Sequence, residues 1–175
     1  MPRKTDISAM NCSLARALGL LTDPWAMLIV RDALLGATRF AEFRSSLGIA
    51  RNVLAQRLGT LVEAGILLRL GTDTRPAYHL SEKGFELVPS LIGLVQWGDK
   101  WLATDGPPIV FRGLDGSVLT PIQLQTMEGQ DVAPRDLVME PGAGADARTR
   151  QKLTMRSSVN NPSTSKYGLD ASDPS

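Results

Sequence analysis

The chain has 175 residues, 43% hydrophobic and 21% charged, which is ordinary globular usage and enough for one domain with an appendage. The chain has 19 Lys and Arg and 18 Asp and Glu, so its net charge is too small to attract a nucleic acid. Any nucleic-acid site therefore depends on where the basic residues lie. The single cysteine excludes an intrachain disulfide, and the apolar runs are far shorter than the roughly 18–20 residues of a membrane span, so we expect a cytoplasmic protein without a membrane partner.

Two helices are predicted before residue 36. The first follows Cys12 and ends near Thr22, and its apolar positions recur at helical spacing: Leu14, Ala15, Leu18 and Leu21. Asp23 is expected to cap the second helix, with Pro24 at its first position. Residues 25–35 are apolar nearly all round, which indicates a buried central helix that ends at Gly36.

Residues 38–64 contain two further helices separated by a very short turn. Thr38 is expected to cap the first, whose apolar face comprises Phe40, Phe43 and Leu47. The second is predicted from about Ala50 to Ala64, with four residues on its buried face: Leu54, Leu58, Leu61 and Val62. Two helices joined so tightly match the helix-turn-helix plan, in which the second helix is offered to the DNA major groove.

A β-hairpin is predicted directly after this motif. Ile66–Leu70 and Ala77–Leu80 are short apolar runs on either side of a polar, turn-rich segment, residues 71–76. A hairpin in this position is a wing, so the predicted fold is a winged helix-turn-helix, mainly α with a β-hairpin (α+β).

A last helix is predicted from Ser81–Gly84 to about Ala103, with Pro89 either kinking it or starting its second half. It has two apolar stripes: Leu87, Leu91, Leu94 and Trp101, and Val88, Ile92, Val95 and Leu102. Either both stripes pack inside the chain, or one of them forms a homodimer interface, which we favour because so small a domain has little core to cover both. The predicted interface residues are Leu14, Leu18, Leu91, Leu94, Trp97 and Trp101.

The pattern weakens beyond Thr104. A small hairpin is expected around Asp115-Gly116, and residues 137–139 are expected to add a strand. Residues 157–175 are rich in serine and poor in apolar residues, so we expect disorder there. The predicted organisation is a DNA-binding and dimerisation domain (1–104), a small β-containing extension (105–156) and a disordered tail (157–175).

Six blocks in the same order resemble the HxlR-type winged helix-turn-helix transcriptional regulators. They are Cys12–Leu18, Trp25–Gly36, Arg39–Phe43, Ile49–Leu58, Tyr78–Gly84 and Trp97–Trp101. The resemblance implies a homodimeric bacterial regulator, which we take to be a repressor, on a palindromic operator in double-stranded DNA. One departure is Ala50, where members often carry Ser, so a side-chain cap of about 1 kcal/mol is absent. Some relatives carry Cys and His at metal-like spacing in the extension, but residues 106–144 contain neither, so we expect no metal and no cofactor.

The DNA-reading residues are expected on the second helix of the motif. Asn52, Gln56, Gly59 and Thr60 emerge opposite the buried leucines. Because Asn and Gln pair bidentately with adenine, Asn52 and Gln56 are the predicted base readers, the alternative being that they are only solvated. Gly59 interrupts this helix either to let DNA approach closely or because it is simply tolerated.

Phosphate contacts are predicted from arginines around that helix. Arg51 in its first turn and Arg57 on its flank are expected to bind phosphate, or guanine if the helix tilts. Arg39 and Arg44 lie on the preceding helix, which crosses the DNA backbone. Arg75, at the wing tip, is expected to enter the minor groove or hold a phosphate, unless it is only solvated.

Cys12 is the candidate sensor. Several relatives in the resembling family respond to quinones, aldehydes or oxidants through a cysteine near the N-terminus, and Cys12 matches that position. A helix start and Arg16 one turn later would favour its thiolate. The alternative is that Cys12 is a small buried hydrophobe, and a small-molecule effector bound elsewhere is a further route to de-repression.

No catalytic arrangement is present in the sequence. One His and one Cys on different elements suggest no nucleophile with its base, and there is no phosphate-cradling glycine motif, so we expect a protein that is not an enzyme. The competing interpretation is a winged helix used as a protein- or ligand-binding module without sequence-specific DNA binding, with residues 104–145 as the binding part.

Overall fold

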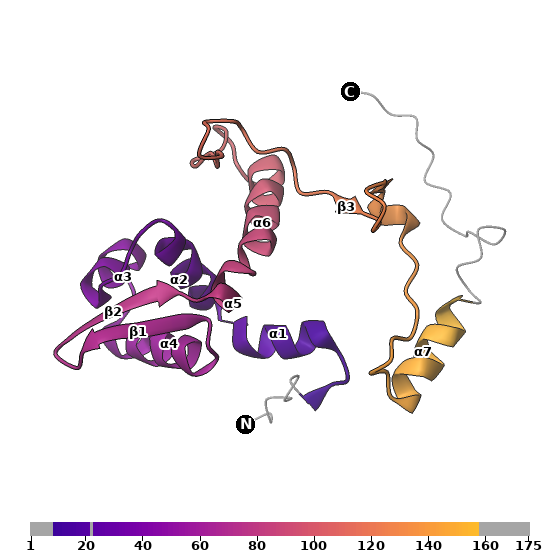
Figure 1. Cartoon of the computed structure of the whole chain (residues 1–175), viewed down its shortest axis with the longest axis horizontal. Helices are drawn as coiled ribbons and strands as arrows, with labels where there is room; N and C mark the ends of the chain where they lie inside the picture. Colours follow the sequence, from indigo (N-terminus) through magenta and orange to yellow (C-terminus); the bar gives the residue numbers. More distant parts are fainter. Residues whose placement is uncertain (1–8, 22, 158–175) are drawn as a thin grey trace. The chain divides into compact units, whose positions relative to one another are not determined.

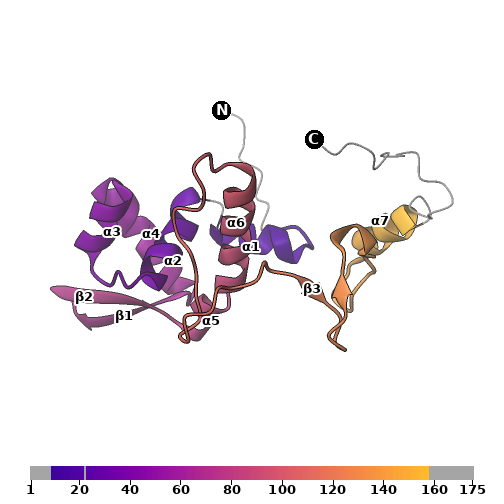
Figure 2. The ribbon, with the colours of Figure 1, turned by 90° about the horizontal axis from the view of Figure 1, so that it is seen from above.

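The computed structural model describes residues 9–21 and 23–157, which fall into two compact units, 1–123 and 124–175. The first unit contains α1 (Ser13–Leu21), α2 (Pro24–Leu34), α3 (Phe40–Leu47), α4 (Arg51–Glu63), β1 (Leu67–Thr72), β2 (Arg75–Leu80), α5 (Glu82–Phe85) and α6 (Val88–Trp101) (Figure 1). Helices α3 and α4 form the helix-turn-helix, and the antiparallel pair β1–β2 lies beside them in both views (Figure 2). The predicted winged helix-turn-helix, mainly α with a β-hairpin, is confirmed.

Helix α2 begins as predicted. The Asp23 carboxylate accepts a hydrogen bond from the Trp25 backbone N–H at 2.8 Å, and Pro24 occupies the first turn. The two charged residues inside this apolar helix pair with each other, because Arg31 donates to Oδ1 of Asp32 through Nε at 2.9 Å and Nη2 at 2.7 Å. Asp32 is buried and its Oδ2 has no partner among the described residues, so α2 carries a charge in the core that depends on its own neighbour.

Helix α3 starts one residue later than predicted. Arg39, not Thr38, is its N-cap residue, because the Glu42 carboxylate accepts hydrogen bonds from the backbone N–H groups of both Thr38 (2.7 Å) and Arg39 (2.9 Å). These bonds lower the pKa of Glu42. The helix ends at Gly48, whose φ of +61° lies in the left-handed region. Ala50 precedes α4 without a side-chain cap, as predicted.

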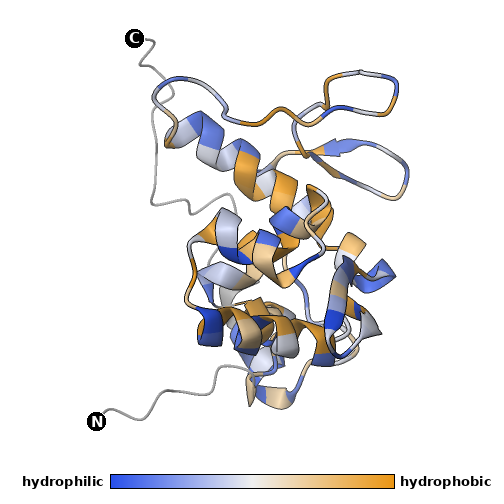
Figure 3. Ribbon diagram, turned by 90° about the vertical axis from the view of Figure 1, so that its left-hand side faces the viewer, coloured by the Kyte–Doolittle hydropathy of each residue, from blue (hydrophilic) through white to orange (hydrophobic). Residues whose placement is uncertain are grey.

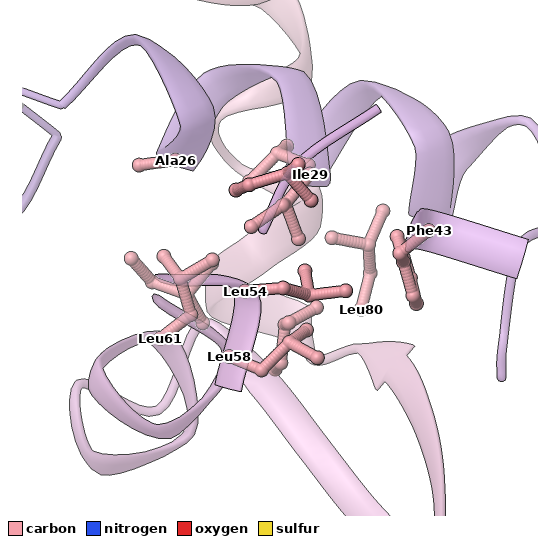
Figure 4. Close-up of a cluster of buried hydrophobic side chains, with 11 residues drawn as sticks. Ala26, Ile29, Phe43, Leu54, Leu58, Leu61 and Leu80 are labelled. Atoms are coloured by element: carbon pink, nitrogen blue, oxygen red, sulfur yellow. The ribbon is translucent and has the colours of Figure 1, made fainter. Parts of the chain in front are cut away.

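The core lies between α2, the two helices of the motif and the hairpin (Figure 4). Leu54, Leu58 and Leu61 present the buried face of α4, each exposing 1% or less of its surface, and they pack with Phe43 of α3 and Ile29 of α2. Hydrophobic and hydrophilic segments alternate along the helices of this unit, as amphipathic helices require (Figure 3). The core therefore fixes which face of α4 is left outside.

The wing is longer than predicted. Its register pairs Leu67 with Leu80 and continues to Thr72 with Arg75, so the connection shortens to Asp73-Thr74. Gly71 has a φ of +87°, and a Cβ there would lie 2.7 Å from the carbonyl oxygen of Arg75. A residue other than glycine would therefore push the two strands apart at this point.

The predicted last helix is divided in two. Ser81 caps α5 by accepting from the Gly84 N–H at 3.0 Å, and α6 begins anew at Val88 with Pro89 in its first turn. Pro89 therefore starts the second half rather than kinking one helix. Gln96 of α6 accepts from the Ile122 N–H at 2.8 Å and donates to the Thr120 carbonyl at 3.2 Å, so residues 120–122 are tied to α6.

The extension differs from prediction in part. A turn at residues 113–117 and the bridge between Arg112 and Val118 form the expected small hairpin. The strand expected at residues 137–139 is absent: these residues are exposed without a partner strand in the part of the chain that the structure describes, and they follow a short 3-10 helix, η2 (Pro134–Asp136).

The second unit also contains elements that were not predicted. They are β3 (Leu124–Gln125), paired antiparallel with β4 (Asp131–Val132), and α7 (Ala147–Ser157). Disorder was predicted for residues 157–175: Ser157 instead ends α7, and residues 158–175 lie outside the described residues. Among the described helices, none alone has the length and apolar composition to cross a bilayer; α1 and α2 meet that test only as a pair bent by 78°.

Candidate nucleic-acid interface

Helix α4 presents a continuous exposed face opposite its three buried leucines. Asn52, Gln56 and Gly59 are exposed on it, as expected, whereas Thr60 is half-buried and donates its hydroxyl to the Gln56 carbonyl at 3.1 Å. Ala55 lies on the same exposed face. Ala55 was not predicted because an apolar residue gives no polar signal, although its methyl group suits contact with a thymine methyl.

Gly59 is not required by packing within the chain. A Cβ at this position would have no atom within 4 Å, and its backbone is ordinary helix. The glycine therefore costs helix stability without any internal packing gain. Both explanations from the sequence, close approach of DNA and simple tolerance, agree with this lack of internal contacts.

Arg44 of α3 and Arg51 of α4 flank one shallow depression. It has a volume of about 470 Å³, and Phe40, Ala41 and Ser45 complete its lining. Both arginines are exposed. Two guanidinium groups on either side of a concave surface at the start of the second helix suit a phosphate of the DNA backbone.

Arg57 is engaged inside the protein. Its Nη2 pairs with Oδ2 of Asp23 at 2.5 Å, its side chain is 29% exposed, and its Nε is buried without a partner in the described residues. The other oxygen of Asp23 caps α2. The charge of Arg57 is therefore already compensated by the start of α2, unlike those of Arg44 and Arg51.

The wing contains two arginines, Arg69 and Arg75, and a third arginine, the α3 N-cap residue Arg39, binds to it. Arg75 is exposed at the tip. Arg69 donates to the Asp73 carboxylate at 3.0 Å, a hydrogen bond that raises the pKa of Arg69. Arg39, expected to bind phosphate, donates through Nη1 to the carbonyl oxygens of Arg75 at 3.0 Å and Pro76 at 3.1 Å. It therefore connects the start of α3 to the wing.

Large apolar side chains are exposed on α1 and α6. On α6, Leu94, Trp97 and Trp101 are 61%, 57% and 64% exposed, and they share one face of the helix. Leu14 and Leu18 of α1 are also exposed. Leu91, predicted with them, is 5% exposed and packs within the chain. We name the exposed set on α6, Leu94, Trp97 and Trp101, the tryptophan stripe.

Cys12 is exposed immediately before α1. Cys12 is therefore not a small buried hydrophobe, which was the alternative considered from the sequence. Arg16 directs Nη2 to the Ser13 hydroxyl at 3.2 Å, so the expected partner of the thiolate has another contact.

These features agree with the comparisons to known proteins. The model of the HxlR-like helix-turn-helix family matches residues 20–105. The uncharacterized HTH-type transcriptional regulator Rv3095 of Mycobacterium tuberculosis is 37% identical over 141 residues, which cover 78% of this chain and 89% of that protein. The uncharacterized HTH-type transcriptional regulator YvaP of Bacillus subtilis is 33% identical over 99 residues, 54% of this chain and 92% of that protein.

Two solved structures are similar over most of the chain. The crystal structure of PA1607, a proposed transcription factor, has a TM-score of 0.72 and 36% identity, and covers 79% of this chain and 100% of its own. The structure of PA1374 from Pseudomonas aeruginosa, also a proposed transcription factor, has a TM-score of 0.58 and 33% identity, and covers 81% of this chain and 99% of its own. With its helix-turn-helix, its wing and these relatives, the chain belongs to the HxlR-like family of DNA-binding transcriptional regulators.

Proposed function

We propose that this regulator is a cytoplasmic homodimeric repressor that reads a palindromic operator with Asn52 and Gln56. The observation that carries the proposal is the orientation of α4. Its leucine face is buried in the core, which leaves both amide side chains exposed on the opposite face of a helix that contacts β1 of the wing. An amide on such a face supplies the donor and acceptor that match adenine N7 and N6 in the major groove.

Backbone contacts are assigned to three exposed arginines of the motif and the wing whose side chains make no hydrogen bond or ion pair among the described residues. Arg44 and Arg51 would share one phosphate across their depression, and Arg75 would reach the adjacent groove from the wing tip. These contacts position the protein on the duplex, whereas Asn52 and Gln56 select the sequence.

Dimerisation is assigned to the tryptophan stripe together with the exposed leucines of α1. Exposed tryptophans on one helix face are typical of interface anchors. A twofold axis between two copies would direct the two α4 helices to successive major grooves, about 34 Å apart, and the operator is then an imperfect palindrome.

De-repression is assigned either to modification of the exposed Cys12 or to a small ligand. Cys12 directly precedes α1, so an adduct there would add bulk beside the proposed dimer contact. For a ligand, a cavity of about 270 Å³ lies between α1, α2 and α4, and it is lined by polar Asp23 and Arg57 and apolar Leu20 and Leu61. Either event would alter the separation of the two α4 helices.

The test begins with selection of bound sequences from random duplex DNA, with and without an electrophile. A palindromic consensus supports the proposal. Gln56→Ala is then expected to relax preference at one base position and to cost about 1–3 kcal/mol of specific binding. The matched control is Gln151→Ala, which removes an exposed helical glutamine from α7.

Two outcomes would contradict the proposal. If Gln56→Ala left the sequence preference intact, the assigned face of α4 would be wrong. If no sequence were enriched, and binding to any partner were insensitive to salt, the chain would be a protein- or ligand-binding module, because operator binding must weaken as salt rises through counterion release.

A further inference from the structure

The start of α3 and the wing are joined by several hydrogen bonds between segments far apart in the sequence. Arg39 donates to the carbonyl oxygens of Arg75 and Pro76, which lie 36 and 37 residues later in the chain. The carbonyl of the neighbouring Thr38 accepts the Tyr78 backbone N–H at 2.8 Å. The wing is therefore attached to α3 at two points, one made by backbone alone and one that needs the Arg39 side chain.

The Arg75 carbonyl oxygen is bonded by Arg39 and lies close to Gly71 of the facing strand. Arg39 donates to this oxygen at 3.0 Å, and on the facing strand Gly71 approaches it so closely that a Cβ would lie 2.7 Å away. This peptide group also carries the exposed Arg75 side chain at the wing tip. Fixing the carbonyl therefore fixes the direction in which the Arg75 side chain leaves the backbone.

Arg39 itself is held at the right place by Glu42. The Glu42 carboxylate accepts the backbone N–H groups of Thr38 and Arg39, and this keeps the Arg39 backbone extended at the entry to α3. On the next turn Phe43 packs edge-to-face against Tyr78, with ring centroids 6.4 Å apart. The start of α3 is thus a rigid base for the wing.

From this geometry we infer that Arg39 is a positioning residue for DNA binding. It acts through the Arg75 and Pro76 carbonyls by aiming the wing, and does not act as a phosphate ligand. The inference rests on the proposed contact of Arg75 with DNA. It differs from the expectation for Arg44, an exposed arginine on the same helix that lines the phosphate depression.

The inference predicts coupling between Arg39 and Arg75. We expect Arg39→Ala to weaken binding to the selected duplex roughly tenfold when Arg75 is present, and to have little further effect in the Arg75→Ala background. The slope of log affinity against log salt concentration should decrease by the amount of about one phosphate contact in either single variant, and by no more than that in the double variant. Arg44→Ala, combined with Arg75→Ala, is the control and should give multiplicative losses and a change of about two phosphates.

A second measurement needs no DNA. Hydrogen exchange of the full chain should be faster at residues 75–80 in Arg39→Ala, and unchanged there in Arg44→Ala, because, of these two arginines, it is Arg39 whose side chain bonds to the wing. Multiplicative losses for Arg39→Ala with Arg75→Ala would make Arg39 a phosphate ligand and overturn the inference, as would unchanged exchange in the wing. If no operator were found, the proposed function would be refuted. The hydrogen-exchange result would still show whether Arg39 attaches the wing to α3.

Discussion

The tryptophan stripe allows a quantitative prediction for dimerisation. Trp97 and Trp101 each leave more than half of their surface exposed, or roughly 150 Å² if a tryptophan presents about 250 Å². At about 25 cal/mol per Å², complete burial would contribute close to 4 kcal/mol, and about half of that survives the costs of association. A twofold dimer contains each residue twice, so Trp101→Ser should weaken the dimer by about 4 kcal/mol, which is roughly a thousandfold.

The assay is sedimentation of the full chain over a wide concentration range, with circular dichroism to verify that the variant is folded. Leu70→Ser is the matched control, because Leu70 is exposed to a similar degree but lies on the wing. We expect the control to dimerise like the unaltered chain and Trp101→Ser to be monomeric at micromolar concentration. Equal dimer affinity in all three proteins would show that the stripe is not the interface.

Three further predictions concern packing, charge and reactivity. Gly84→Ala should lower the free energy of unfolding by about 1–3 kcal/mol, because a Cβ would collide with the Ile66 carbonyl, whereas Gly59→Ala should raise it by up to about 1 kcal/mol. Urea denaturation measures both values, and the reverse order of stability would contradict the packing described. Because backbone hydrogen bonds lower the folded-state pKa of Glu42, its stabilisation is present above the ordinary pKa of 4.5 and is lost as the pH falls through the folded value. Thermal melts should therefore show a deficit for Glu42→Gln at neutral pH that vanishes in acid, and a deficit independent of pH would refute the assignment. Diamide or a quinone should release operator DNA from the unaltered chain but not from Cys12→Ser; equal release from both would leave Cys12 without a sensing role.

The helices and the wing were predictable because their signals are local. The leucines of α4 recur at helical spacing, Gly48 ends α3, and Asp23-Pro24 starts α2, so a few neighbouring residues determine each element. Thr38 was wrongly predicted to be the N-cap residue of α3. Its backbone N–H instead donates to the Glu42 carboxylate, a contact that the general preference of threonine for N-cap positions does not reveal.

The partners of the arginines were not predictable. Arg57 and Arg39 match the expected positions of phosphate ligands, but one pairs with Asp23 and the other with wing carbonyls more than 30 residues away. Such pairs depend on how helices pack, and periodicity contains no information on that. The burial of Leu91 was not predictable for a related reason: Leu91 is 5% exposed and Leu94, one turn later, is 61% exposed, although the two share the same predicted apolar stripe.

The Asp23 carboxylate has a consequence for engineering the specificity of this regulator. One oxygen caps α2 and the other pairs with Arg57 of α4, so a helix grafted from another regulator without arginine at this position would leave Asp23 half unsatisfied. Positions 52, 55, 56 and 59 are exposed. A library that randomises these four positions and retains Arg57 would explore new operators while keeping the scaffold folded.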